Sequence, residues 1–362
     1  MIRGDGRDLG DGAVAAAVAR IAPLDTGAVA DAAALHDRLT KPAGSLGRLE
    51  HLGLRLAGIA GDCPPPLPAP ATVAVFAGDH GVVARGVTPW PQEVTAQMVA
   101  NLCAGGAAIN VLARQVGAQV VVVDVGVLAP LDDAPGLLRR RVRAGTADLA
   151  TGAAMTLDEA RRALDVGADV AASLVAGGAR CLVTGDMGIG NTTPSAALIA
   201  ALTRRRPAEV TGRGTGVDDP MLARKVAVVT AAQELHAGAF AAGPLATLAA
   251  VGGLEIAALA GFIIGGAAAG VPVVVDGVIS GAALLVAAAL APGCVDRCIA
   301  GHRSAEPGAG VVLAHLDLEP VLDLDLRLGE GSGACLALPL VEAAARILRE
   351  MATFDAAGVS GK

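Results

Sequence analysis

Residues 180–193 read RCLVTGDMGIGNTT, and this stretch decides the fold class. A short apolar run meets a glycine-rich turn, and an Ala- and Leu-rich helical segment follows. The same succession occurs at residues 72–77 before GDHG, 120–123 before DVG, 271–275 before DGVISG and 297–300 before GHRS. Continuous apolar strands that alternate with helices are typical of a parallel sheet covered on both faces. The sequence therefore predicts an α/β fold.

The N-terminal part of the chain has a different pattern. Residues 13–21 and 28–39 are Ala-rich, and residues 46–59 carry apolar side chains at helical spacing. The proline-rich stretch CPPPLPAP, residues 63–70, follows as a stiff extended linker. We therefore expect a helical N-terminal part and a boundary near residue 70.

Composition excludes several classes of protein. Hydrophobic residues make up 53% of the 362 residues, which excludes disorder for most of the chain. The formal net charge is −7, with one Trp, four Phe and no Tyr, so neither a basic face nor stacking platforms for nucleic acid are expected. Six cysteines without a C-x-x-C pair, and an N-terminus without an apolar signal core, indicate a reduced, cytoplasmic protein.

An uncharged stretch, residues 256–275, is long enough to cross a membrane. It is rich in Ala and Gly, contains Pro272, and lacks flanking basic clusters and aromatic belts. We therefore predict a buried helix followed by a strand that ends at Asp276, and no membrane span.

Polar side chains gather where the predicted strands end. In open parallel sheets, ligands bind beyond the carboxyl ends of the strands. The alternative for each residue is an ordinary turn position, but the presence of such polar side chains at five strand ends favours a binding site. The residues are Asp79, His80, Asp124, Asp186, Asn191, Asp276, His302 and Ser304.

Two glycine-rich loops suit an anion. In GDMGIGNTTP, residues 185–194, glycines allow backbone amides to approach a phosphate; the alternative is a turn capped by Thr192 or Thr193, with Pro194 near the first helical position. In GRGTGVDDP, residues 212–220, Asp218 or Asp219 caps a helix that carries Arg224 and Lys225. That basic pair is either solvated or, at Lys225, binds phosphate. The first loop has neither the spacing of a P-loop nor that of the dinucleotide fingerprint G-x-G-x-x-G.

The stretch LRLGEGSGA, residues 326–334, places Glu330 between glycines before an apolar helix. Glu330 is either a first-turn acid that interacts with the helix dipole or a partly desolvated general base. The histidines of GDHG (78–81) and GHRSAEPG (301–308) have no paired-ligand spacing, so we expect no metal site. No nucleophile elbow is present.

Seven motifs occur together and in order: KPAGSLGRLE (41–50), FAGDHGV (76–82), PQEVTAQMV (91–99), GDMGIGNTT (185–193), DGVISGAAL (276–284), GHRSAEPG and LRLGEGSGA. They closely resemble the nicotinate-nucleotide:dimethylbenzimidazole phosphoribosyltransferase family, which makes the lower ligand of cobalamin. The resemblance implies transfer of phosphoribose from nicotinate mononucleotide to dimethylbenzimidazole, with inversion at the anomeric carbon. It also implies a homodimer without metal or cofactor.

The resemblance implies a Rossmann-like parallel sheet with helices on both faces and a small helical domain built from the chain ends. We therefore expect an α/β catalytic domain at residues 71–330, and a helical domain at residues 1–70 with 331–362.

The resemblance also assigns residues. It makes Glu330 the catalytic base, and it places the phosphate on the GDMGIGNTT loop and Lys225. The acceptor base is expected near Asp79, His80 and Gln92, and Asp276 near the charge that develops on the ribose. The remaining expected substrate contacts are Asp186, Gly188, Gly190, Asn191, Thr192 and Ser304.

The chain departs from the family pattern at three positions. Ala43 stands where a second Pro is usual, Asp186 where Glu is common, and Ala309 where His is frequent. The scarcity of aromatics predicts an aliphatic acceptor pocket of Leu, Met and Val, which would loosen base specificity. Three alternatives remain open: a relative that uses another aromatic acceptor such as adenine or a phenol, a dinucleotide-binding oxidoreductase, and a membrane transporter component.

Overall fold

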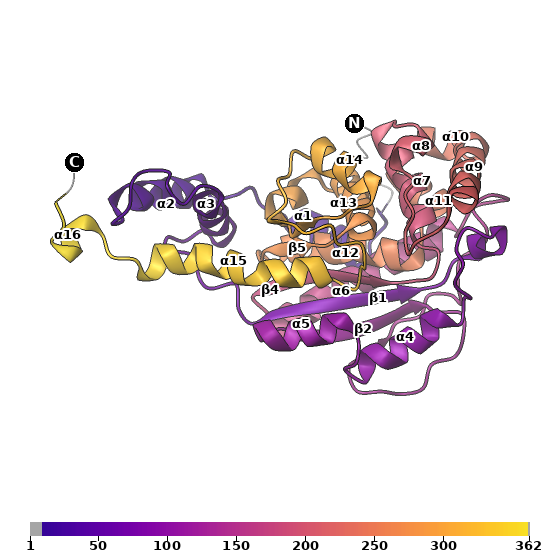
Figure 1. Cartoon of the computed structure of the whole chain (residues 1–362), viewed down its shortest axis with the longest axis horizontal. Coiled ribbons are helices and arrows are strands. Elements are labelled where there is room, and N and C mark those ends of the chain that lie inside the picture. Colours follow the sequence, from indigo (N-terminus) through magenta and orange to yellow (C-terminus); the bar gives the residue numbers. More distant parts are fainter. Residues whose placement is uncertain (1–8, 361–362) are drawn as a thin grey trace.

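The computed structural model describes residues 9–360, and a six-stranded parallel sheet forms its centre (Figure 1). The strand order is β3-β2-β1-β4-β5-β6, the order of Rossmann folds. The five predicted strands are confirmed, and the three-residue β3 was not predicted because it is too short to show a pattern. The strands are β1 (Ala71–Gly78), β2 (Gln119–Gly126), β3 (Leu137–Arg139), β4 (Cys181–Met187), β5 (Val273–Val275) and β6 (Cys298–Ala300).

Side chains of the central strands alternate between two apolar cores, as the pleat requires. Ala74 and Phe76 of β1 enter one core, and Val73 and Val75 enter the other. The first core is covered by α1 (Ala13–Arg20), α6 (Leu157–Ala176), α7 (Thr192–Thr203), α11 (Pro244–Val251), α12 (Leu254–Ala268) and α13 (Val278–Leu290). The second is covered by α4 (Val94–Cys103), α5 (Ala108–Val116) and α15 (Ser332–Glu350). Helices therefore lie on both faces, as predicted.

The remaining elements surround this frame. A two-stranded parallel ribbon joins β7 (His302–Arg303) to β8 (Leu322–Asp323). The other helices are α2 (Thr26–Arg38), α3 (Arg48–Ala60), α8 (Pro207–Val210), α9 (Asp219–Leu235), α10 (Ala237–Ala242), α14 (Pro307–His315) and α16 (Phe354–Ala357).

The uncharged stretch 256–275 is the buried helix α12 followed by β5, as predicted. Glycines explain how α12 and α6 approach so closely: a Cβ at Gly167 would lie 1.8 Å from the Ala258 carbonyl oxygen, and one at Gly261 would lie 1.9 Å from the Leu164 carbonyl oxygen. Among the described residues, only Val94–Val116 is long and apolar enough to cross a membrane by length and composition. It is weak evidence for a membrane span, because it consists of α4, α5 and the turn between them.

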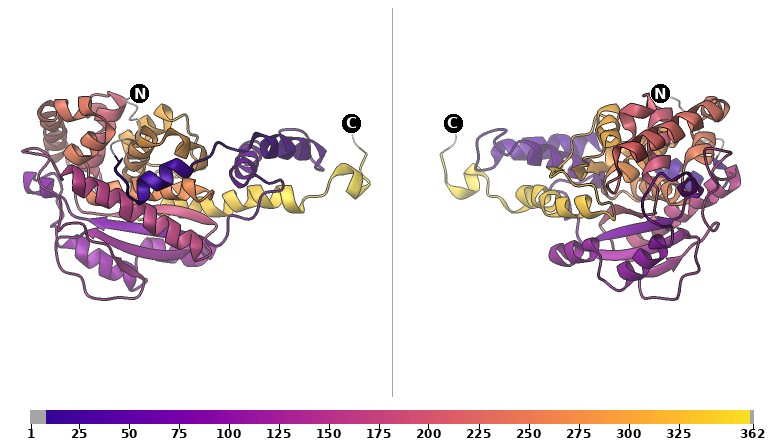
Figure 2. Two further views of the ribbon diagram at one scale, coloured as in Figure 1. Left: turned by 180° about the vertical axis from the view of Figure 1, so that it is seen from behind. Right: turned by 45° about the vertical axis from the view of Figure 1, so that its right-hand side comes forward.

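The chain ends divide between two places. Helices α2, α3 and the end of α15 form a small apolar cluster through Ala32, Ala57 and Leu348, and they extend away from the sheet (Figures 1 and 2). Helix α1 instead packs on α6 and α12, with Val14 and Ala17 in the main core. Residues 13–20 therefore do not pack with the small helical unit expected for residues 1–70, and the division into two domains stays a prediction.

The strand order creates the crevice in which ligands bind in such sheets. After β1 the chain turns to β2 on one side, whereas after β4 it turns to β5 on the other. The carboxyl ends of β1 and β4 lie side by side, with Ala77 opposite Met187. A switch point of this kind leaves the turns after neighbouring strands free to form a site.

Candidate active site

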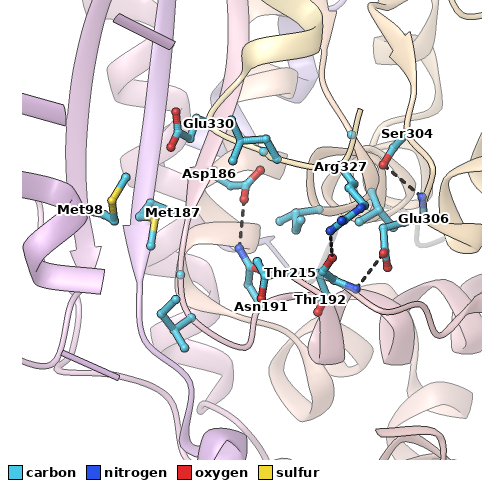
Figure 3. A pocket seen from close by; sticks show the side chains of 18 of the residues that line it. Met98, Asp186, Met187, Asn191, Thr192, Thr215, Ser304, Glu306, Arg327 and Glu330 are labelled. Atoms are coloured by element: carbon cyan, nitrogen blue, oxygen red, sulfur yellow. Dashed lines mark hydrogen bonds between the residues drawn. The ribbon is translucent and has the colours of Figure 1, made fainter. Parts of the chain in front are cut away.

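A cavity of about 450 Å³ lies beyond the carboxyl ends of β4 and β5 (Figure 3). It is bounded by the turns after these strands, by α4, and by residues 302–306 and 327–330. Six of the predicted site residues line it: Asp186, Gly188, Asn191, Thr192, Ser304 and Glu330. The sheet thus brings together residues that are up to 144 positions apart in the sequence.

Glu330 lies in a turn that forces the backbone into the left-handed region. Gly329, Glu330 and Gly331 have φ angles of +87°, +64° and +88°. For a side chain other than Gly this conformation costs about 1–2 kcal/mol. The turn is held against the sheet because the Glu330 amide donates to the Asp186 carbonyl oxygen at 3.2 Å. Helix α15 begins only at Ser332, so the alternative of a first-turn acid is wrong.

The Glu330 carboxylate is buried on one wall of the cavity. Its Oε2 accepts a hydrogen bond from the Ile109 amide at 3.2 Å, and the residue is 5% exposed. Burial raises the pKa of Glu330, the Ile109 bond opposes this effect, and the nearby Asp276 carboxylate adds to the increase. A carboxylate with a raised pKa is better suited to accept a proton near neutral pH.

Asp186 lies beside Glu330 and has different chemistry. The Asn191 side chain donates to Asp186 Oδ2 at 3.0 Å, while Asp186 Oδ1 has no partner (Figure 3). Burial, with Asp276 and Glu255 nearby, raises the pKa of Asp186 well above its ordinary value. The neutral acid is therefore favoured, and it presents an O–H donor where a charged carboxylate would repel anions.

The opposite end of the cavity is built around the N-terminus of α7. No side chain caps this helix, so the alternative of a turn capped by Thr192 or Thr193 is wrong. Thr192 Oγ1 instead accepts a hydrogen bond from Lys225 Nζ at 2.8 Å. An uncapped helix N-terminus beside a lysine is a typical anion-binding arrangement.

Lys225 is almost fully buried on α9, whose N-terminus is capped by Asp218 as expected. Its ammonium also donates to the Gly212 carbonyl oxygen at 2.9 Å. Burial lowers the pKa of Lys225 to about 8, and the negative charge of Glu306 opposes that decrease. Lys225 and Gly190 line a narrow hollow that shares Gly188, Asn191, Thr192 and Gly214 with the main cavity.

Two residues of this end were not assigned from the sequence. Glu306 Oε1 accepts the Gly214 amide at 2.8 Å, and Arg327 Nη1 donates to the Gly214 carbonyl oxygen at 3.0 Å (Figure 3). Both therefore hold the loop that contains Thr215 against the cavity. Glu306 and Arg327 belong to the motifs GHRSAEPG and LRLGEGSGA, so the sequence marked the segments that contain them. A motif alone does not reveal which of its polar side chains faces the cavity.

The wall next to Glu330 is apolar. Met98 of α4 and Met187 of β4 face the cavity, together with Val94, Ile189 and Leu328 (Figure 3). Trp90, the only tryptophan, is 48% exposed and also lines the cavity. The lining agrees with the predicted aliphatic pocket, with one aromatic side chain added.

Three residues expected to hold the acceptor base do not line the cavity. Asp79 is buried, and its Oδ2 accepts the Leu128 amide at 2.8 Å. His80 is buried in an ion pair with Glu255 at 2.9 Å. The Gln92 side chain donates to the His80 carbonyl oxygen at 3.3 Å. The cavity geometry therefore does not support direct contact between the acceptor and Asp79, His80 or Gln92, and a role for them near the acceptor stays a prediction.

Asp276 is also buried outside the cavity lining, because its carboxylate accepts two backbone amides at the start of α15. The expected contact with the ribose is therefore not supported. Among the described residues, no group of three or more His, Cys, Asp and Glu side chains has an arrangement that would hold a metal ion. All six cysteines are free thiols.

Comparison with known proteins agrees with this fold. A family model described as phosphoribosyltransferase matches residues 21–359. The chain therefore belongs to this phosphoribosyltransferase family. A relative from Salinispora tropica, named nicotinate-nucleotide–dimethylbenzimidazole phosphoribosyltransferase, is 60% identical over 95% of this chain and 98% of its own length. A relative of the same name from Chloroflexus aggregans is 56% identical over 94% of this chain and 96% of its own length.

A solved structure shares the fold. The crystal structure of a nicotinate-nucleotide–dimethylbenzimidazole phosphoribosyltransferase from Thermus thermophilus is 51% identical to this chain, with a TM-score of 0.89. The match covers 94% of this chain and 100% of the crystallised one. The predicted Rossmann-like class is therefore confirmed along almost the whole chain.

Proposed function

We propose that this chain transfers phosphoribose from nicotinate mononucleotide to 5,6-dimethylbenzimidazole, giving α-ribazole 5′-phosphate and nicotinate. The observation that carries the proposal is the position of Glu330, on the apolar wall of a cavity whose other end holds the uncapped N-terminus of α7 beside Lys225. The names of the relatives supply the two substrates.

The two ends of the cavity suit the two halves of the reaction. The phosphate binds at the N-terminus of α7, where Lys225 and Thr192 lie together. The flat heterocycle occupies the apolar wall of Met98, Met187 and Leu328. The ribose then spans the space between them, beside the neutral acid of Asp186.

The chemistry needs a single proton acceptor. One benzimidazole nitrogen attacks the anomeric carbon, and the glycosidic bond to the pyridinium breaks with its electron pair, which leaves neutral pyridine nitrogen on nicotinate. The second benzimidazole nitrogen loses its proton to the Glu330 carboxylate. Because the leaving pyridinium ring is already cationic, its departure requires no strong acid, and attack from the opposite face inverts the anomeric carbon.

The proposal includes the setting of the reaction. We expect a homodimer in the cytoplasm, with no membrane span, no nucleic-acid partner and no metal or cofactor. An aliphatic wall gives few directional contacts, so a related acceptor such as adenine or a phenol is the second candidate. A dinucleotide oxidoreductase is disfavoured because the glycine loop lacks the required spacing.

The test combines purified chain, nicotinate mononucleotide and dimethylbenzimidazole, and measures released nicotinate and α-ribazole 5′-phosphate. We expect Glu330→Gln to lower kcat at least ~100-fold, with little change in the KM of the nucleotide. Glu350→Gln, at the exposed far end of α15, is the matched control. Release of nicotinate with adenine or a phenol alone would select the second candidate, and absence of release with every acceptor would refute the transferase assignment.

A further inference from the structure

The turn that carries Glu330 is held from behind by Asp276. Asp276 Oδ2 accepts the Gly331 amide at 3.2 Å, and Oδ1 accepts the Ala334 amide at 2.9 Å. Both amides closely follow Glu330 in the chain, at the N-terminus of α15. Since the Glu330 amide is bonded to the carbonyl of Asp186, the base is fixed on both sides.

His302 completes this support. Its Nε2 lies 3.3 Å from Asp276 Oδ1, and the side chains of His302 and Asp276 are 3% and 1% exposed. The imidazole packs directly on the first turn of α15, because a Cβ at Gly333 would lie 2.1 Å from His302 Cδ2. His302 therefore has little freedom to leave Asp276 while α15 stays in place.

We propose that Asp276 and His302 are positioning residues for Glu330: they anchor its turn, and the proton on His302 sets the net charge behind the base. The proposal rests on the proposed role of Glu330 as base. With His302 protonated, the Asp276–His302 pair is neutral; with His302 neutral, a full negative charge remains beside Glu330. Burial lowers the pKa of His302, but the hydrogen bond and charge of Asp276 outweigh it and raise the pKa; burial raises the pKa of Glu330, and Asp276 adds to that increase.

Other titratable groups near Asp276, His302 and Glu330 contribute less to the charge beside Glu330. Asp186 faces Glu330 from β4, but its raised pKa favours the neutral acid. Cys335 faces Asp276, and its thiol is neutral because burial raises its pKa to about 11. Asp323 faces His302 from β8, where its side chain is 61% exposed and paired with Arg303, so solvent screens its charge.

The test is the pH profile of kcat/KM for phosphoribosyl transfer. His302→Gln leaves the Asp276 charge uncompensated, so the pKa of Glu330 rises and the acidic limb moves up by about 0.5–1 pH unit. Asp276→Asn removes that charge, so the acidic limb moves down by a similar amount. A purely structural role would lower the rate without moving the limbs in opposite directions. Asp323→Asn is the matched control and leaves the profile unmoved.

The outcomes separate this inference from the proposed function. An acidic limb that stays in place in both variants, or moves the same way in both, overturns the positioning role. If Asp276→Asn does not fold, His302→Gln alone decides, and an unmoved limb in that variant overturns the inference. If Glu330→Gln retains full turnover, the base assignment itself fails instead.

Discussion

Replacement of Lys225 by Met tests the anion end of the cavity through its pH dependence. The lysine is 1% exposed, and burial lowers its pKa from 10.5 to about 8. That difference corresponds to about 3 kcal/mol, at 1.36 kcal/mol per pH unit. Below pH 8 the lysine is charged in both the folded and unfolded states, so the full destabilisation is present. It disappears as the pH rises from about 8 to 10.5, because the folded state loses its proton first.

The first measurement is the free energy of unfolding of wild type and Lys225→Met in urea, at about pH 7 and at about pH 10.5. We expect wild type to gain about 3 kcal/mol relative to the variant as the pH rises. The variant also loses the hydrogen bonds from Lys225 to Thr192 and Gly212. This loss adds a constant to the difference in unfolding free energy between the two proteins and does not alter how that difference depends on pH.

The second measurement is the KM of the nucleotide for the two proteins. A neutral amine attracts phosphate far less than an ammonium, so the wild-type KM rises about tenfold between about pH 7 and about pH 9. The KM of Lys225→Met is higher at neutral pH and flat over the same range. A wild-type KM that does not change, together with an unfolding difference that is independent of pH, would refute a buried lysine with a lowered pKa.

Two further predictions concern the wall next to Glu330. In Gly185→Ala, the new Cβ would lie 2.6 Å from the Glu330 carbonyl oxygen, so we expect kcat to fall at least ~10-fold and stability to fall by about 1–3 kcal/mol, as seen by kinetics and urea unfolding. Gly152→Ala, whose Cβ meets nothing within 4 Å, is its control, and equal effects of both would contradict the reasoning. Trp90 is the only tryptophan and lines the cavity, so dimethylbenzimidazole should change the tryptophan emission of the wild type; unchanged emission at a concentration that saturates turnover would place the base elsewhere.

The order of strands and helices was predicted well from the sequence, because it is decided by the pattern of apolar residues. Strands such as β1 and β4 are buried on both faces, so each contains a mostly apolar run in the sequence. Helix α12 was distinguished from a membrane span by its Gly content and by Pro272, and the structure shows why the glycines are there: α6 crosses α12 at that point. Short β3 has too few residues to show periodicity, so it was missed.

The direction of polar side chains was predicted less well, because it depends on tertiary contacts. His80 and Asp186 both follow or end a strand, yet His80 turns inward to Glu255 while Asp186 faces the cavity. Glu255 lies 175 residues after His80, and its approach is set by the packing of α12 on the sheet. Likewise, capping of α7 by Thr192 was one alternative left open by the sequence, but Lys225 reaches the Thr192 hydroxyl from α9. Turn motifs identify where a site lies and not which atoms face it.

The distribution of charge in the site explains how acids and an anionic substrate share one cavity. Asp186, Glu255, Asp276 and Glu330 lie near the same strand ends, and four ionised carboxylates there would oppose the binding of a phosphate ester. The fold neutralises three of them in different ways: burial favours the protonated form of Asp186, His80 pairs with Glu255, and His302 pairs with Asp276. Glu330 keeps a backbone donor and no cationic partner among the described contacts, which leaves it free to accept a proton. Lys225, which we propose binds the phosphate, lies at the other end of the cavity, so its positive charge does not pair with the proposed base Glu330.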